Sequence, residues 1–341
     1  MRAVIYTTPG GPEVLELVDR EIPAPGPKEV LVRVHVSGVN PTDWKSRRAL
    51  SGSLAYPEIV PNQDGSGVIT AVGKGVSEER IGERVWIYEA CHGRAFGTAQ
   101  EYIAIEQKKA VRLRDDSSFD LGASLGIPAL TAHRCLTAGD RRPERLGPKV
   151  LQGETVLVAG GAGAVGHFAV QLAHWSGARV ITTVSNEEKS ELAKRAGADE
   201  TVNYRAGGVI EKIRSLAPEG VDLIVEVSSV INHPINSQVL KEGGTIAIYA
   251  SGDELLALDI RSMMRLNAGI EFIYTYTVAR AAKRASVKDV SRALRDGALG
   301  VGEEHGLPLI RFGLGETDLA HRCVEDGATG KVVIHTLDVP H

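Results

Sequence analysis

The sequence predicts an α/β protein with two domains: a β-rich domain and a doubly wound parallel-sheet domain. Three observations predict this. Short apolar runs separated by glycine and proline fill residues 1–125, strand and helix patterns alternate over residues 126–271, and a β-rich stretch follows. We expect this last stretch, residues 272–341, to complete the first domain.

Strand patterns in the first domain are short. Every second residue of 30–36 is valine, which is the period of a half-buried strand. Glycines bound a second strand at 65–73, and a third is expected at 84–88. Near the C-terminus we expect β structure at 270–278, a helix near 317–325 and a strand at 331–335.

The second domain alternates buried strands with helices. Strands are expected at 155–159, 179–184, 221–227 and 244–249, and a helix at about 186–196. This alternation is typical of a parallel sheet with helices on both faces.

Composition argues against several classes of protein. Hydrophobic residues make up 43% and charged residues 24%, which is ordinary for a soluble globular protein. The net charge is -4, without the basic excess that nucleic-acid binders usually carry. We therefore expect no nucleic acid as a partner.

The cysteines and the apolar segments suggest a location. Three cysteines lie far apart without a CxxC motif, so we expect no four-cysteine zinc site, no disulfide framework and a reducing, cytoplasmic compartment. The chain reaches Pro9 too soon for a signal-peptide core. Residues 156–173 could mimic a membrane span, but they contain His167 and Gln171, so no membrane partner is expected.

The strongest motif is a complete GxGxxG, Gly161-Ala162-Gly163-Ala164-Val165-Gly166, between the strand 155–159 and a helix. Glycines permit the tight turn and let backbone N–H groups approach a pyrophosphate, while the helix N-terminus adds partial positive charge. The alternative is a tight turn that binds nothing. The strand–helix context favours a dinucleotide, bound by Gly161, Gly163, Ala164, Val165 and Gly166.

The end of the second strand bears on which dinucleotide is bound. NAD sites usually place an acid there to bond the ribose 2′-OH, whereas this strand ends in Ser185. Ser185 and Glu188 resemble a capping box, and Lys189 and Tyr204 could contact a 2′-phosphate. Glu187 and Glu188 argue the other way, and an ordinary capped helix is the alternative. The balance favours NADP(H).

The whole chain resembles the medium-chain dehydrogenase/reductase superfamily, and within it the zinc-free, ζ-crystallin-like quinone oxidoreductases. The matching motifs are Gly38-Val39-Asn40-Pro41-Thr42-Asp43, Asp64-Gly65-Ser66-Gly67-Val68, Gly73, Gly82-Glu83-Arg84-Val85 and Leu130-Thr131-Ala132. The resemblance implies a GroES-like catalytic domain, a Rossmann domain and NADPH between them. It also implies that Thr131 lies near the nicotinamide, and we add Ser251 to the candidate cofactor contacts.

The resemblance also bears on whether this chain binds a zinc ion. Zinc-dependent members carry cysteine, a His-Glu pair and a second cysteine where this chain has Asn40, Gln63-Asp64 and Ile127. These do not make an ordinary zinc ligand set, so we expect no metal. Without a Lewis acid, the acceptor should already be electron-poor.

Position in the motif makes Asn40 and Asp43 the candidate catalytic residues. Asn40 can donate from its amide, and Asp43 could order Asn40 or Lys45, or relay a proton. The alternative is an Asn-Pro turn with an Asp cap. Tyr56, Trp86 and Tyr88 are candidates for the substrate pocket wall, with core packing as the alternative for each.

The expected function is NADPH-dependent, zinc-independent hydride transfer to a quinone. Two alternatives stay open: an enone or enoyl-thioester reductase on the same fold, and an NADPH-binding sensor or structural protein without turnover. The resemblance implies a homodimer joined at edge strands, for which residues 270–278 are the expected edge.

Overall fold

The computed structural model describes residues 1–49, 52–252 and 254–337. The chain divides into two compact units, one of Met1–Ile127 with Pro308–His341 and one of Pro128–Leu307. The predicted α/β class, with a GroES-like unit and a Rossmann unit, is confirmed. Among the described residues, no helix has both the length and the apolar character needed to cross a bilayer.

The first unit is built on a seven-stranded sheet with the order β14-β15-β3-β4-β5-β7, in which β6 also pairs with β3. The valines expected to alternate along β3 do so, and Val30, Val32 and Val34 are buried. The strands are β3 (Glu29–Gly38), β4 (Asp64–Val72), β5 (Arg84–Ile87), β6 (Tyr102–Glu106), β7 (Ala110–Arg112), β14 (Leu309–Gly313) and β15 (Lys331–His335).

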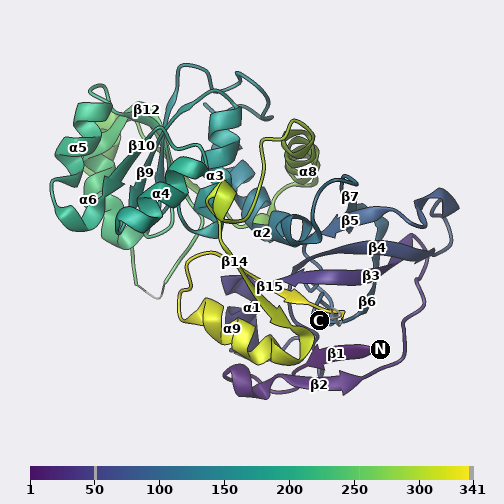
Figure 1. Ribbon diagram of the computed structural model, residues 1–341. Coiled ribbons are helices and arrows are strands. Elements are labelled where there is room, and N and C mark those ends of the chain that lie inside the picture. Colours follow the sequence, from purple (N-terminus) through teal and green to yellow (C-terminus); the bar gives the residue numbers. More distant parts are fainter. Residues whose placement is uncertain (50–51, 253, 338–341) are drawn as a thin grey trace. The chain divides into compact units, whose positions relative to one another are not determined.

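Two short strands and two helices complete this unit (Figure 1). Strands β1 (Arg2–Ile5) and β2 (Glu16–Asp19) form a separate antiparallel pair. Helix α1 (Pro41–Arg47) follows β3 directly, and α9 (Thr317–Glu325) packs against it. Helix α2 (Phe119–Thr137) begins in this unit and ends in the next.

The second unit contains a six-stranded parallel sheet with the order β10-β9-β8-β11-β12-β13. The first strand of this unit, β8, therefore lies in the middle of the sheet. The strand order reverses beside it, as in doubly wound folds. The strands are β8 (Thr155–Ala159), β9 (Arg179–Val184), β10 (Glu200–Asn203), β11 (Val221–Glu226), β12 (Leu240–Ile248) and β13 (Gly269–Phe272).

Helices lie on both faces of this sheet, with α3 and α4 on one side and α5 and α6 on the other (Figure 1). Apolar side chains of the strands and of α5 form a continuous core around Leu157, Ile181 and Ile213. The helices are α3 (Ala164–Trp175), α4 (Glu187–Arg195), α5 (Val209–Leu216), α6 (Ser229–Val239), α7 (Ile260–Leu266) and α8 (Arg280–Arg295).

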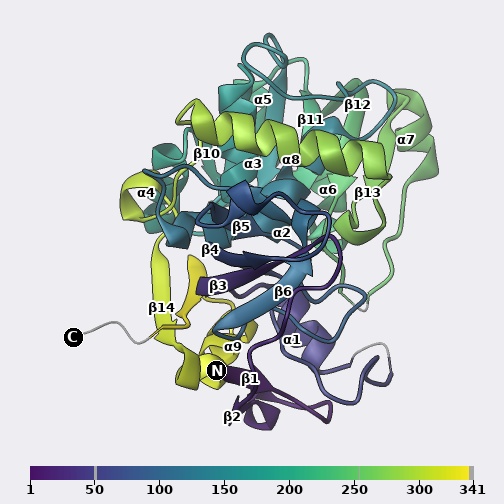
Figure 2. The same ribbon diagram turned by 90° about the vertical axis from the view of Figure 1, so that its right-hand side faces the viewer.

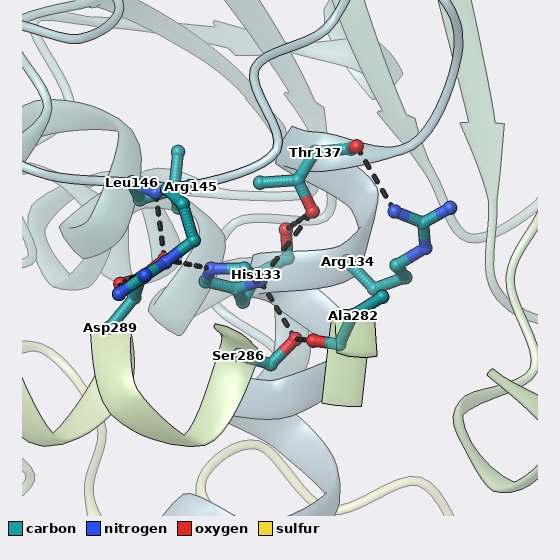
Figure 3. A network of polar contacts seen from close by, with 8 residues as sticks. All are labelled: His133, Arg134, Thr137, Arg145, Leu146, Ala282, Ser286 and Asp289. Carbon is teal, nitrogen blue, oxygen red and sulfur yellow. Dashed lines mark hydrogen bonds and ion pairs between the residues drawn. The ribbon is translucent and has the colours of Figure 1, made fainter. Parts of the chain in front are cut away.

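The chain returns to the first unit at Pro308, later than the expected residue 272. The predicted β stretch 270–278 contributes only β13, and a short 3₁₀ turn, Thr275–Thr277, follows it. Helix α8, seen lengthwise in Figure 2, belongs to the second unit, where buried Asp289 on this helix bonds His133 and Arg145. Figure 3 shows this network.

Candidate active site

The GxGxxG loop leaves β8 and enters α3, and the two glycines at its ends pack too tightly for any side chain. A Cβ at Gly161 would lie 2.2 Å from Thr182 Oγ1, and one at Gly166 would lie 2.3 Å from the carbonyl oxygen of Gly160. A Cβ at Gly163 would meet nothing closer than 3.5 Å, so this face of the loop is open. The loop therefore fits the dinucleotide fingerprint: two glycines serve packing and one leaves room for a ligand.

Helix α3 offers backbone donors at the same place. The first bond into the helix runs from the N–H of His167 to the carbonyl of Gly163 at 2.7 Å. The N–H groups of Ala164, Val165 and Gly166 precede it and have no acceptor inside the helix, as at every helix start. Together with the helix dipole, these groups can bind a pyrophosphate.

The ends of β9 and β10 lie side by side, because Val184 pairs with Asn203 in the parallel register. Ser185 and Tyr204 therefore follow neighbouring strand ends. Ser185 is buried, whereas Tyr204 is 48% exposed. Lys189 is half-buried one turn into α4.

The predicted capping box of Ser185 and Glu188 is wrong. The residue that caps α4 is Asn186, whose Oδ1 accepts from the N–H of Lys189 at 2.9 Å. Because the cap lies one residue later, the third helical position is Lys189 and not Glu188. Glu187 and Glu188 are both exposed.

Two further cofactor candidates belong to the same unit. Thr131 is buried in α2, and Ser251 is an exposed residue in the loop after β12. Because all strands of the sheet are parallel, the glycine loop, Ser185, Tyr204 and Ser251 all follow carboxyl ends of strands at one edge. Thr131 is held on a helix and not at a strand end.

In the first unit, Asn40 is the centre of a buried polar cluster. Its amide oxygen accepts from Lys331 Nζ at 2.7 Å, and its Nδ2 donates to Asp64 Oδ2 at 2.7 Å. Its backbone N–H donates to Asp43 Oδ2, also at 2.7 Å. The exposed fractions of Asn40, Asp43, Asp64 and Lys331 do not exceed 4%.

Burial and mutual charge govern the ionisation of this cluster. Burial, reinforced by the charge of Asp64, raises the pKa of Asp43. Burial also raises the pKa of Asp64 to about 6, although Lys331 and Asn40 oppose the shift. Burial lowers the pKa of Lys331 against the attraction of both carboxylates. A cluster of one lysine and two aspartates is neutral when one aspartate keeps its proton, and Asp43 is the one most strongly driven to do so.

Comparison with known proteins identifies the family. Residues 26–115 match the family described as alcohol dehydrogenase GroES-like domain, and residues 164–292 match the one described as zinc-binding dehydrogenase. Human quinone oxidoreductase is 30% identical over 338 residues, which cover 98% of this chain and 97% of the relative. The chain belongs to the medium-chain dehydrogenase/reductase superfamily. Within it, the chain falls in the quinone oxidoreductase-like group, and it is accordingly an oxidoreductase.

Solved structures agree with this membership. A structure described as an NAD-dependent alcohol dehydrogenase has a TM-score of 0.85 and 28% identity, covering 99% of this chain and 100% of that chain. A mycobacterial protein complexed with NADPH has a TM-score of 0.81 and 26% identity, covering 98% of this chain and 100% of that chain.

The residues expected at the zinc positions are engaged in other contacts or are apolar in the structure. Asn40 is bonded on both sides of its amide, and the side-chain oxygen of Gln63 accepts from the backbone N–H of Cys91 at 3.0 Å. Ile127 offers no ligand atom, and its backbone N–H donates to Asp64. Within the described ranges, no three His, Cys, Asp or Glu side chains gather closely enough to hold a metal ion.

The three aromatic candidates for the substrate pocket lie in different settings. Trp86 is fully buried in β5, with its ring 5.7 Å from that of Tyr88. The hydroxyl of Tyr88 donates to the carbonyl of Lys108 at 3.3 Å. Tyr56 is half-buried and lies outside regular structure. The structure therefore brings buried Trp86 and Tyr88 together, on β5 and directly after it.

Sequence reasoning missed Lys331, and it gave Asp64 no role in the site although Asp64 belongs to a matching family motif. A signal for Lys331 was present, since in the strand Lys331–His335 a lysine directly precedes three apolar residues. Lysine is almost never fully buried without a partner. A lysine at the start of a buried strand therefore predicts an acidic group or a carbonyl nearby. Its partner Asn40 is 291 residues away, so no local pattern could name it.

Proposed function

We propose that the protein is an NADPH-dependent reductase that delivers a hydride to an electron-poor carbonyl acceptor of the quinone class. The observation that carries the proposal is the end of β9. Buried Ser185 takes the place of the acid that would accept from the ribose 2′-OH of NAD, and half-buried Lys189 supplies a positive charge one turn away. The similarity to a mycobacterial structure that contains NADPH supports the same preference.

The cofactor would be held at the carboxyl edge of the Rossmann sheet. Backbone N–H groups of Ala164, Val165 and Gly166 bind the pyrophosphate, and the open face of Gly163 admits it. Ser185, Lys189 and Tyr204 hold the 2′-phosphate, while Thr131 and Ser251 are proposed as contacts nearer the nicotinamide end. When bound, NADPH supplies the hydride.

The acceptor would be electron-poor, because the residues expected at the zinc positions do not form an ordinary ligand set for a Lewis-acid metal. At the three zinc positions, Asn40 and Gln63 are engaged in hydrogen bonds and Ile127 is apolar. Asn40 would stabilise the negative charge that develops on the acceptor oxygen, and Asp43 would hold the backbone of Asn40 in place. Tyr56, Trp86 and Tyr88 are kept as candidates for the acceptor's apolar surroundings.

Steady-state NADPH oxidation with a panel of quinones, enones and enoyl thioesters tests this proposal. Turnover with quinones and not with enones supports it. The reverse pattern identifies an enone or enoyl-thioester reductase. NADPH binding, measured by fluorescence quenching, without turnover on any acceptor would mean that the protein only binds the cofactor. The panel is run with NADH in parallel.

A further inference from the structure

The amide of Asn40 is locked in one orientation by the chemistry of its two neighbours. An ammonium group can only donate, so the Asn40 atom 2.7 Å from Lys331 Nζ must be the amide oxygen. An ionised carboxylate can only accept, so the atom 2.7 Å from Asp64 Oδ2 must be the amide nitrogen. Rotating the amide by half a turn would oppose donor to donor and acceptor to acceptor.

Both neighbours are themselves held. Lys331 Nζ also donates to the carbonyl of Val39 at 3.0 Å. The two oxygens of Asp64 accept from the N–H of Ile127 at 2.9 and 3.0 Å. Lys331 and Asp64 are at most 1% exposed, so no bulk water competes for these bonds.

One hydrogen of the Asn40 amide remains. The NH₂ group carries two hydrogens, and Asp64 takes one. The second has no acceptor among the residues that the structure describes. Leaving a buried N–H hydrogen without an acceptor is unfavourable, so its retention in an otherwise satisfied cluster points to a ligand atom as its acceptor.

We propose that Lys331 and Asp64 are positioning residues that orient the Asn40 amide, so that its free N–H donates to the carbonyl oxygen of the acceptor. This inference rests on the proposed function. In the reaction NADPH is oxidised to NADP⁺ and the hydride adds to an electrophilic carbon of the acceptor. The displaced π electron pair moves to the carbonyl oxygen, and water then protonates that oxygen. Asn40 donates a hydrogen bond to the developing oxyanion and loses no proton.

A charge swap separates orientation from structural support. The double variant Asn40→Asp with Asp64→Asn keeps a Lys331–carboxylate contact, an amide-to-carboxylate bond and an acceptor for the N–H of Ile127. The net charge of the cluster is also unchanged. The variant differs in one respect: position 40 presents an oxygen where Asn40 presents an N–H.

The swap variant should keep the melting temperature of the wild type, because the hydrogen bonds of the cluster persist. It should also keep the affinity for NADPH, because the glycine loop lies in the other unit. Its kcat with a quinone should fall by about 100- to 1,000-fold, the usual effect of removing one oxyanion donor. A folded swap with the kcat of the wild type would overturn the inference and leave the proposed function intact. A wild type that turns over no acceptor of the panel would overturn both.

A second pair of variants covers the case in which the swap does not fold. Lys331→Gln keeps a donor toward the Asn40 oxygen, whereas Lys331→Met has a similar length and none. Orientation predicts a kcat at least about tenfold higher for Lys331→Gln, with the same KM for NADPH. Equal kcat values for the two variants would mean that Lys331 only fills space.

Discussion

His133 and Asp289 form a buried hydrogen bond of 2.9 Å between Nε2 and Oδ2, which joins α2 to α8 within the second unit (Figure 3). Asp289 also accepts from Arg145 and from the backbone N–H of Leu146. Burial raises the pKa of Asp289, but the bonds from His133 and Arg145 outweigh it and lower the pKa to about 2. This carboxylate therefore stays ionised and holds α8 to the nucleotide unit.

Removing the Asp289 carboxylate should destabilise the second unit strongly. Asp289→Ala leaves His133, Arg145 and the N–H of Leu146 without their acceptor, and the expected loss is about 3–5 kcal/mol of unfolding free energy. Asp296, just beyond the same helix, is 39% exposed and its carboxylate lies 3.7 Å from Arg292. Asp296→Ala should therefore cost about 1 kcal/mol or less. Denaturant unfolding of both variants gives the comparison, and equal losses would contradict the role assigned to Asp289.

The cofactor preference should depend on Lys189. A charge-assisted phosphate contact contributes about 1.5–3 kcal/mol, so we expect kcat/KM to favour NADPH over NADH by at least about tenfold. Lys189→Ala should remove most of that difference. Lys194 on the same helix is ion-paired to Glu191 at 2.8 Å, and Lys194→Ala should leave the preference unchanged. Equal use of both cofactors by the wild type would refute this assignment.

Activity should not depend on a metal ion. The residues at the zinc positions, Asn40, Gln63 and Ile127, are not an ordinary ligand set. Dialysis against a strong chelator should leave kcat and the melting temperature unchanged. Elemental analysis that finds one tightly bound zinc per chain, with activity lost on its removal, would refute the prediction.

Acid should weaken the second unit through His167. Burial lowers the pKa of His167 from 6.5 to about 4, against the opposing effect of its bond to the carbonyl of Gly300. Below pH 6.5 the unfolded chain therefore binds a proton that the folded chain does not. This contribution to stability is complete above that pH and is lost as the pH falls toward about 4.

Urea unfolding between about pH 7 and about pH 5 should therefore show a loss of about 1–2 kcal/mol from this group. His167→Gln should show a smaller loss, because its amide can still donate to Gly300 without titrating. His174 lies on the same helix and is exposed, so His174→Gln should keep the pH dependence of the wild type. An unchanged dependence in His167→Gln would show that other groups cause it.

The protein should dimerise through β13, the edge strand of the parallel sheet. Phe272 on this strand is 75% exposed and Tyr274 just after it is 60% exposed, so a second copy could cover both the backbone edge and these rings. Light scattering at micromolar concentration should report a dimer or a dimer of dimers. Phe272→Lys should shift the protein toward monomer, whereas Ile231→Lys, at a site that is 73% exposed on α6, should not. A monomeric wild type would contradict this expectation.

The parts of the fold that depend on neighbouring residues were predictable. The strands β8, β9 and β15 and the helix α9 lie at the predicted residues, because apolar periodicity and glycine punctuation act within a few positions. The GxGxxG motif could likewise be assigned from its strand and helix. The cap of α4 was misplaced by one residue because Ser185 and Asn186 are both good N-caps, and only the backbone path chooses between them.

The sequence by itself determined the α/β class, the position of the nucleotide loop and the absence of an acid at the end of β9, because each is written in consecutive residues. Only the tertiary structure decided that residues 272–307 stay with the nucleotide unit and that Asn40 is held between Lys331 and Asp64. Those contacts join residues as much as 291 positions apart. Such partners are chosen by which buried donors and acceptors the packed sheets bring together, and no local pattern records that choice.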